Sequence, residues 1–220
     1  NEAIEVYEEM ETIGALQGRG AEYYQKLGYA LQKNKKYAEA IDAYLKADTL
    51  KPDNIWNNRH LAICYRLNRN YQAALSYYKK VEEATPEDTN VIFHIGSCLA
   101  ELGQYEEAAN YFFKLDFIES NCIKAWRGIG WCSFISRKYE QAMKYYEKII
   151  EQKPLAIDYM NAGHVAWTMG DIQKAAALYG KSITANGNRE RFLEMFRKDK
   201  EALLKQGIQE EDIPLMLDLL

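Results

Sequence analysis

The chain has 220 residues, of which 48% are hydrophobic and 27% charged, and its formal net charge is −4. This balance argues against a general nucleic-acid-binding protein, which would carry a basic surface, and no apolar run approaches the ~20 residues that cross a membrane. Four cysteines without a disulfide framework favour a reducing compartment, so we expect a soluble, cytoplasmic protein.

Residues 1–20 are expected to contain the second helix of an earlier helical hairpin, followed by a loop. Ala3, Tyr7 and Met10 have the spacing that recurs in the second helices of the later repeats, and no first helix precedes them. Since the sequence opens in the middle of this pattern and without methionine, we expect it to be a piece of a longer protein.

From Ala21 onward a pattern of small and large residues returns every 34 positions, which is the signature of stacked structural repeats. Glycine or alanine occupies repeat positions 8 and 20, as at Gly28 and Ala40, and an aromatic residue occupies position 24, as at Tyr44. Small residues let two helices approach closely, so each repeat is predicted to be a helical hairpin. We expect five such hairpins, over 21–54, 55–88, 89–122, 123–155 and 156–187.

Proline at position 32 is expected to close most repeats, because it cannot continue a helix but is tolerated in the first turn of the next one. These prolines are Pro52, Pro86 and Pro154. Shortly after this position stand residues whose side-chain oxygen is expected to cap the following helix. They are Asn54, Asp88 and Asn121.

Residues 188–220 leave the repeat pattern and are predicted to form a C-terminal capping helix and a short apolar final helix. Phe192, Phe196 and Leu203 lie on a helical period, and charged residues occupy the other positions. The final helix, 213–220, is expected to dock onto the last repeat; the alternative is that it binds a partner or mediates self-association.

These repeat positions resemble the tetratricopeptide repeat: small residues at 8 and 20, an aromatic residue at 24, proline at 32 and, in the fourth repeat, Trp126 at position 4. The resemblance implies an all-α fold, in which stacked helix-turn-helix hairpins form a right-handed superhelical solenoid. It also implies that the first helices of the repeats line a concave groove.

The sequence contains none of the usual catalytic or cofactor motifs, so we expect no enzymatic activity and no cofactor. His60 and His94 stand at the same position of adjacent repeats, but a zinc site needs three or four converging ligands, and no metal site is predicted. The cysteines at position 10 are expected to be buried core residues, whereas Cys122, at a repeat junction, is expected to be exposed and reactive.

Positions 2, 5, 9 and 12 of each first helix form one stripe, which is expected to face the groove. Hairpin packing does not require large residues there, and aromatic and arginine side chains carry most of the energy of protein interfaces. The ligand is therefore predicted to be a peptide segment with apolar anchors and acidic groups. The candidate peptide-binding residues are Tyr29, Trp56, Arg59, Ile63, Arg66, Asn90, Phe93, Lys124, Arg127, Trp131, Phe134, Met160, His164 and Trp167.

The leading functional hypothesis is a non-catalytic scaffold or adaptor that captures a segment of a protein partner in this groove. One alternative is a regulatory or substrate-recruiting arm of an enzyme whose catalytic domain lies outside these residues. Another is a secretion-type chaperone. A structural alternative is that the C-terminal helix fills the groove and covers its aromatic residues.

Overall fold

The computed structural model describes residues 20–220, in which every regular element is an α-helix. The all-α fold is therefore confirmed, while the helix predicted near the start of the chain lies outside the described residues. The chain divides into two compact units, Asn1–Gly103 and Gln104–Leu220. The division falls inside the predicted repeat 89–122, between its two helices.

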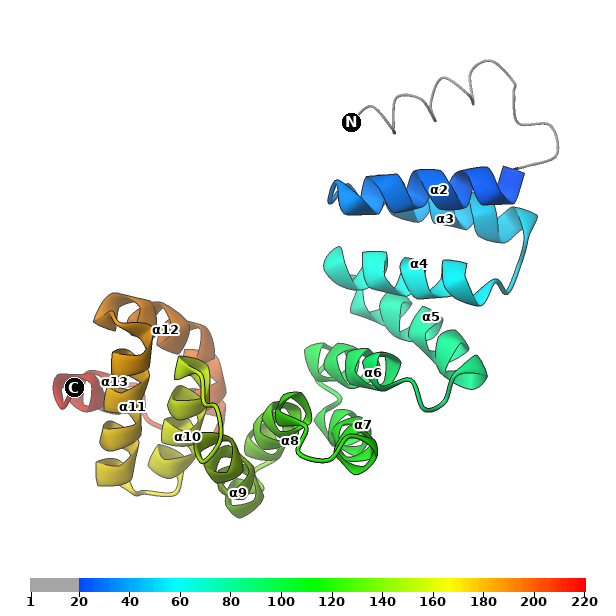
Figure 1. Cartoon of the computed structure of the whole chain (residues 1–220). Helices are drawn as coiled ribbons and strands as arrows, with labels where there is room; N and C mark the ends of the chain where they lie inside the picture. Colours follow the sequence, from blue (N-terminus) through cyan, green and yellow to red (C-terminus); the bar gives the residue numbers. More distant parts are fainter. Residues whose placement is uncertain (1–19) are drawn as a thin grey trace. The chain divides into compact units, whose positions relative to one another are not determined.

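The first unit contains five described helices, each packed against the next along the chain (Figure 1). Its helices are α2 (Gly20–Lys33), α3 (Tyr37–Leu50), α4 (Ile55–Leu67), α5 (Tyr71–Ala84) and α6 (Thr89–Glu101). The pairs α2/α3 and α4/α5 are the helical hairpins that the repeat pattern predicts.

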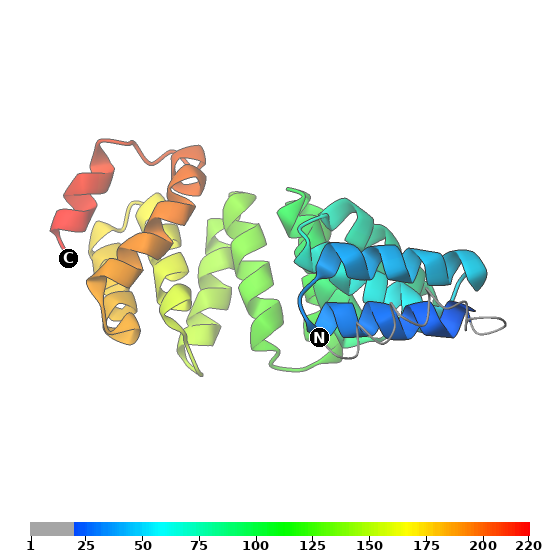
Figure 2. The same cartoon turned by 90° about the horizontal axis from the view of Figure 1, so that it is seen from above.

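The second unit continues the same arrangement and adds two helices at its C-terminal end. Its helices are α7 (Tyr105–Ile118), α8 (Ile123–Ile135), α9 (Tyr139–Ile150), α10 (Ala156–Thr168), α11 (Ile172–Asn186), α12 (Arg189–Lys205) and α13 (Asp212–Asp218). The helix α12 packs against both α10 and α11, as expected of a capping helix (Figure 2).

In the hairpins α2/α3, α8/α9 and α10/α11 the glycine at position 8 lies against the aromatic ring at position 24. A Cβ atom added to Gly28 would lie 2.8 Å from the ring of Tyr44, and one added to Gly163 would lie 2.5 Å from the ring of Tyr179. Both tyrosines are fully buried. The small residue is therefore required because the ring of the second helix lies directly on the backbone of the first.

Two of the three predicted helix caps are present, and the third prediction is wrong. The side chain of Asn54 accepts a hydrogen bond from the backbone N–H of Asn57, and that of Asp88 accepts from Asn90 and Val91. Asn121 instead has a left-handed backbone conformation (φ 61°), and α8 begins one residue later, after Cys122, without a side-chain cap. Asparagine tolerates this conformation, so it serves the turn and not the helix end.

All four cysteines are buried, which corrects the expectation that Cys122 is exposed. Its thiol donates a hydrogen bond to the carboxylate of Glu119 at 3.3 Å. Burial raises the pKa of Cys122, raises those of Cys64 and Cys132 to about 12, and raises that of Cys98 to about 11. At neutral pH these groups are therefore thiols, the unreactive form.

The short final helix α13 is attached to the second unit by one of its faces. Ile213 and Met216 are buried, and the Arg189 side chain donates a hydrogen bond to the backbone carbonyl of Leu217 at 2.8 Å. Leu215 and Leu219 stay 64% and 63% exposed. Across residues 20–220, no helix combines the length and the apolar content that crossing a bilayer requires.

Candidate functional site

Three aromatic rings from two successive first helices meet on the surface of the first unit. Tyr29 of α2 and Trp56 of α4 have ring centroids 6.2 Å apart, and the ring of His60 lies 4.0 Å from that of Trp56 and 5.5 Å from that of Tyr29. Tyr29 is 41% and Trp56 44% exposed. The two rings are therefore held in place by neighbours and still reach solvent.

A hydrogen-bond network beneath these rings fixes the position of His60. The His60 ring stacks on Tyr44 at 5.6 Å, and its Nδ1 lies 2.8 Å from Oε1 of Gln32, which also accepts a hydrogen bond from the Tyr44 hydroxyl. Burial, followed by the charges of Arg59 and Lys33, lowers the pKa of His60 to about 4. At neutral pH the His60 ring is therefore uncharged, and it packs against the ring of Trp56.

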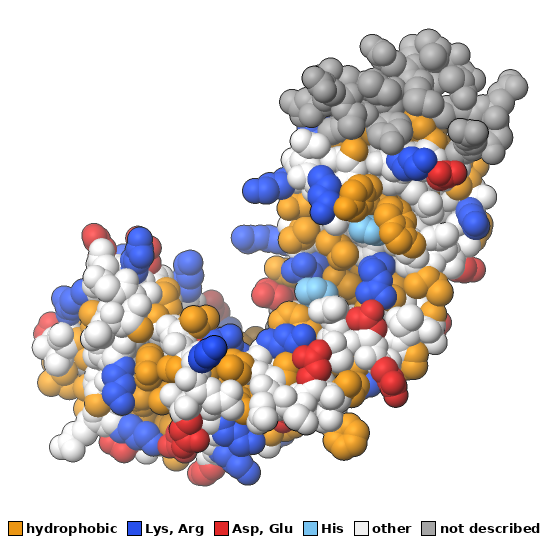
Figure 3. All heavy atoms as spheres, viewed as in Figure 1, with side chains coloured by type: hydrophobic (Ala, Val, Ile, Leu, Met, Phe, Trp, Pro, Cys, Tyr) orange, Lys and Arg blue, Asp and Glu red, His pale blue; other side chains and the backbone are white. Residues whose placement is uncertain are grey.

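The two helices that carry the exposed rings also carry three cations, Lys33 on α2 and Arg59 and Arg66 on α4. The Lys33 ammonium lies 5.1 Å from the centre of the Tyr29 ring, and the Arg66 guanidinium donates to the Tyr78 hydroxyl at 3.4 Å. Arg59 forms an ion pair with Asp88 at 2.8 Å. We call the surface made by Tyr29, Trp56, His60, Lys33, Arg59 and Arg66 the cationic aromatic face. Figure 3 shows hydrophobic, basic and histidine side chains gathered on one side of the first unit.

The carboxylate that holds Arg59 belongs to the cap of the next helix. Burial opposes the ionisation of Asp88, but the backbone N–H of Val91, the Arg59 guanidinium and the backbone N–H of Asn90 outweigh it, so the pKa of Asp88 lies below its ordinary value. Asp88 is therefore ionised at neutral pH and fixes Arg59 beside Trp56. Both side chains stay partly exposed, Arg59 at 30% and Asp88 at 24%.

The other predicted residues of the first unit border this face. Ile63 and Phe93 are partly buried, and Asn90 is exposed. The second histidine, His94, stacks on Tyr78 at 5.4 Å, as His60 stacks on Tyr44. The two histidines are thus equivalent packing residues, and within residues 20–220 no group of three or more His, Cys, Asp or Glu side chains is placed to hold a metal ion.

The second unit presents its predicted binding residues differently. Four of them are buried, with at most 5% of the side chain exposed: Phe134, Met160, His164 and Trp167. Helix α12 covers two of them, because its Phe196 ring lies 5.4 Å from that of His164 and 6.4 Å from that of Trp167, while the Phe134 ring lies 6.4 Å from that of His164. These four residues therefore belong to the core of the second unit and do not form an open binding stripe.

The predicted cations of the second unit are engaged in ion pairs within the chain. Arg127 forms two parallel hydrogen bonds of 2.7 Å with the carboxylate of Asp158, which is only 1% exposed. That carboxylate also accepts from the backbone N–H of Leu155, at the start of α10. Arg127 therefore joins α8 to α10, and Lys124 is paired with Glu119 at 3.3 Å.

Trp131 is the remaining predicted residue of the second unit. It is partly buried, and its ring centroid lies 5.7 Å from that of Phe134. It lies on α8 and has no place in the cationic aromatic face, which belongs wholly to the first unit.

Sequence reasoning missed two contributors to the cationic aromatic face, Lys33 and His60. A signal for both is present, because Lys33 follows Tyr29 by four residues and His60 follows Trp56 by four. Residues four apart lie on the same side of a helix, one turn from each other. Extending the stripe by one turn from each large aromatic residue would have included them.

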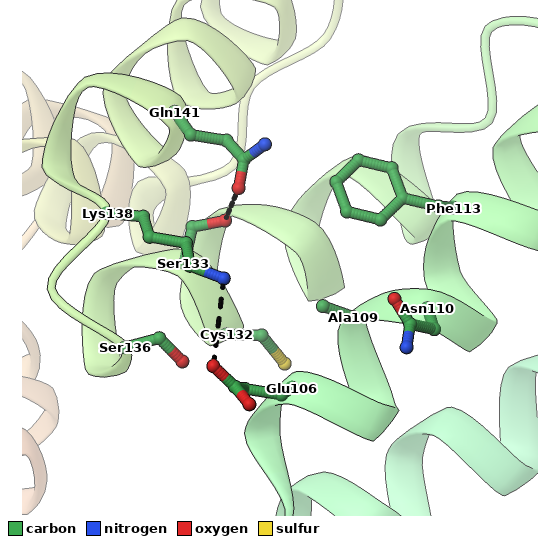
Figure 4. Close-up of a pocket in the computed structure, with 9 residues that line it drawn as sticks. All are labelled: Glu106, Ala109, Asn110, Phe113, Cys132, Ser133, Ser136, Lys138 and Gln141. Carbon is green, nitrogen blue, oxygen red and sulfur yellow. Dashed lines mark hydrogen bonds and ion pairs between the residues drawn. The ribbon is translucent and has the colours of Figure 1, made fainter.

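A separate polar pocket of about 250 Å³ lies among α7, α8 and α9 in the second unit. Inside it the Ser133 hydroxyl donates to Gln141 at 2.9 Å, and the Lys138 ammonium lies 3.9 Å from the Glu106 carboxylate (Figure 4). These four side chains thus pair with one another, and none of the predicted binding residues lines the pocket.

Similar solved structures share this helical architecture. YrrB, a TPR protein with an unusual peptide-binding site, superposes with a TM-score of 0.69 at 20% identity, over 89% of this chain and 100% of its own. A tetratricopeptide repeat protein from Parabacteroides merdae gives 0.67 at 20% identity, over 99% and 90%. MamA from Desulfovibrio magneticus gives 0.71 at 16% identity, over 77% and 96%. At these identities the likeness concerns the fold alone.

Sequence comparison assigns the family. No curated protein matches the chain. Two family models, both described as tetratricopeptide repeat, do match: one covers residues 66–132, and the other covers 21–54, 123–154 and 159–189. The chain belongs to the tetratricopeptide repeat family.

Proposed function

We propose that this chain is a non-catalytic scaffold that binds a peptide segment of a protein partner on the cationic aromatic face of its first unit. The tetratricopeptide repeat fold is a protein-interaction scaffold, and the similar protein YrrB has a peptide-binding site. The observation that carries the proposal is the pair of exposed rings, Tyr29 and Trp56, 6.2 Å apart on two helices that also carry Lys33, Arg59 and Arg66.

The face suits a ligand with apolar anchors and acidic groups. Exposed aromatic rings that neighbours hold in place can bury apolar side chains at little cost in conformational entropy. Lys33 lies 5.1 Å from the centre of the Tyr29 ring, and Arg59 is one turn from Trp56 on α4. A carboxylate of the ligand would be attracted to these cations, and the attraction would weaken as salt is added.

The proposed site is therefore smaller than the predicted stripe. It retains the seven predicted residues of the first unit, adds Lys33 and His60, and omits the seven predicted residues of the second unit. The retained residues are Tyr29, Trp56, Arg59, Ile63, Arg66, Asn90 and Phe93. The recruiting-arm and chaperone alternatives stay predictions, and so does the cytoplasmic location.

Selection of peptides on the full-length chain tests this proposal. A displayed library of random peptides is selected on the wild type, and the affinity of the enriched sequences is measured by fluorescence anisotropy. We expect enriched peptides to combine leucine or aromatic residues with Asp or Glu. The Trp56→Ala variant should bind them at least about tenfold more weakly, which corresponds to ~1.4 kcal/mol.

The matched control is Phe117→Ala, because Phe117 is an aromatic side chain that is 90% exposed and lies in the second unit, outside the proposed site. This variant should bind the selected peptides like the wild type. Equal affinities of the Trp56→Ala and Phe117→Ala variants would contradict the proposal, as would enrichment of peptides rich in Lys and Arg.

A further inference from the structure

The C-terminal end of the second unit carries an exposed apolar surface. Ile172, Leu215 and Leu219 are 43%, 64% and 63% exposed, and they line a pocket of about 540 Å³ together with Trp167 and Met216. We call this surface the C-terminal patch. Exposed apolar surfaces with a polar rim commonly mark sites of protein contact.

The patch is presented by a fixed helix. The α13 residues Ile213 and Met216 are buried, and Lys200 of α12 pairs with Glu210, just before α13, at 2.6 Å. Leu219 follows the last residue of α13 with a helical backbone conformation and stands four residues after Leu215, so the two side chains project from the same side. Such a pair can enter a partner surface as two adjacent anchors without prior ordering of the helix.

The segment that forms the patch is acidic. Residues 206–220 contain four carboxylates and no Lys, Arg or His. Two of these, Asp212 and Asp218, line the pocket beside the exposed leucines. The patch thus combines leucine anchors with negative charge, which is the chemistry that the cationic aromatic face is proposed to bind.

We infer that the C-terminal patch of one copy of this chain docks on the cationic aromatic face of a second copy. The inference rests on the proposed function, because it names an occupant of the same face. Leu215 and Leu219 pack against the Tyr29 and Trp56 rings, and the carboxylates of the patch approach the cations of the face. A symmetric contact between two patches is disfavoured, because it would bring Asp212 and Asp218 of both copies together.

The contact is head-to-tail, so each copy offers one patch and one face. A contact of this type leaves an unused face and an unused patch at the two ends of every dimer, and longer assemblies form as the concentration rises unless a ring closes. Because opposite charges meet, we expect the assembly to weaken at high salt.

Sedimentation velocity of the full chain, from micromolar to millimolar concentration and at low and high salt, tests this inference with two variants. Leu215→Glu/Leu219→Glu removes the patch and keeps the face, whereas Trp56→Ala/Arg66→Glu removes the face and keeps the patch. All substituted side chains are at least partly exposed, and thermal unfolding of each variant checks that it is folded.

The wild type is expected to gain mass with concentration at low salt and to lose it at high salt. Each variant alone should stay monomeric, and an equimolar mixture of the two should form a dimer that does not grow, since one intact patch meets one intact face. A wild type that stays monomeric throughout would overturn the inference, as would assembly of the patch variant alone. Assembly of the face variant alone would replace it with a patch-to-patch contact.

The same variants separate this inference from the proposed function. If the library yields acidic, apolar peptides that need Trp56 and the wild type stays monomeric, the proposed function stands and the self-contact fails. If the wild type assembles through the face but the library yields no peptide, the self-contact stands and the capture of foreign peptides fails.

Discussion

The α2–α4 region of the first unit and the α10–α12 region of the second use the same repeat positions for opposite purposes. Position 9 is Tyr29 in the first repeat and His164 in the fifth, yet Tyr29 is 41% exposed and His164 is fully buried. The difference comes from Phe196 of α12, whose ring lies 5.4 Å from that of His164. A repeat position therefore becomes a surface or a core position according to what packs on it.

The arginines at position 5 show the same contrast. Arg59 holds Asp88 through one contact between two partly exposed side chains, whereas Arg127 holds the buried carboxylate of Asp158 through two. The first arrangement leaves a cation at the surface, where a ligand can reach it. The second joins two helices, and a ligand carboxylate could bind Arg127 only by displacing Asp158.

The largest expected difference between the two regions comes from replacing one tryptophan of each region with alanine. Trp167→Ala removes a side chain that is 5% exposed, so we expect a loss of ~3–5 kcal/mol in the free energy of unfolding. Trp56→Ala removes one that is 44% exposed and should cost about 1 kcal/mol or less. Urea denaturation followed by circular dichroism measures both. Similar losses for the two variants would show that the two regions do not differ in the way described.

The second prediction compares the carboxylates of Asp158 and Asp88. Asp158→Ala leaves Arg127 without its partner and the Leu155 N–H without an acceptor, and we expect a loss of about 3 kcal/mol, at the low end for a buried pair because Arg127 is partly exposed. Asp88→Ala removes a more exposed pair and one helix cap, for about 1 kcal/mol. Chemical denaturation of the two variants tests the order, and an equal or larger loss for Asp88→Ala would argue against it.

The last prediction concerns pH and belongs to the first region. The pKa of His60 is lowered from 6.5 to about 4 in the folded chain, so the unfolded chain takes up a proton on this residue at higher pH than the folded chain does. Stability should therefore fall as the pH drops from about 6.5 toward 4. Melting temperatures of the wild type and of His60→Gln across this range measure the contribution. The variant should lose less stability on acidification, and an identical decline in both proteins would rule out His60 as a source.

The sequence predicts the helices well because their pattern depends on neighbours in the chain. The contact of Gly28 with Tyr44 repeats at Gly163 and Tyr179, so a period of 34 residues is enough to find each hairpin. The repeat pattern does not show which residues cover each helix. The burial of His164 depends on Phe196, 32 residues away and outside the repeat pattern, so the stripe of equivalent positions could not distinguish it from Tyr29.

The pairing of Arg127 was missed for a related reason. Its partner Asp158 stands at a repeat position where the other repeats have no carboxylate, and its value as a partner comes from its place at the start of α10. Asn121 shows that local structure is also ambiguous in the sequence. Asparagine suits both a helix cap and a left-handed turn, and the sequence pattern does not distinguish them.

Hydroxyl-radical footprinting with mass spectrometry, with and without a peptide selected on the full chain, tests the central contrast most directly. We expect Tyr29 and Trp56 to be oxidised rapidly in the free chain and to be protected when the peptide is bound, while Trp167 reacts slowly in both samples. Rapid oxidation of Trp167 in the free chain, or unchanged oxidation of Trp56 at saturating peptide, would contradict the account.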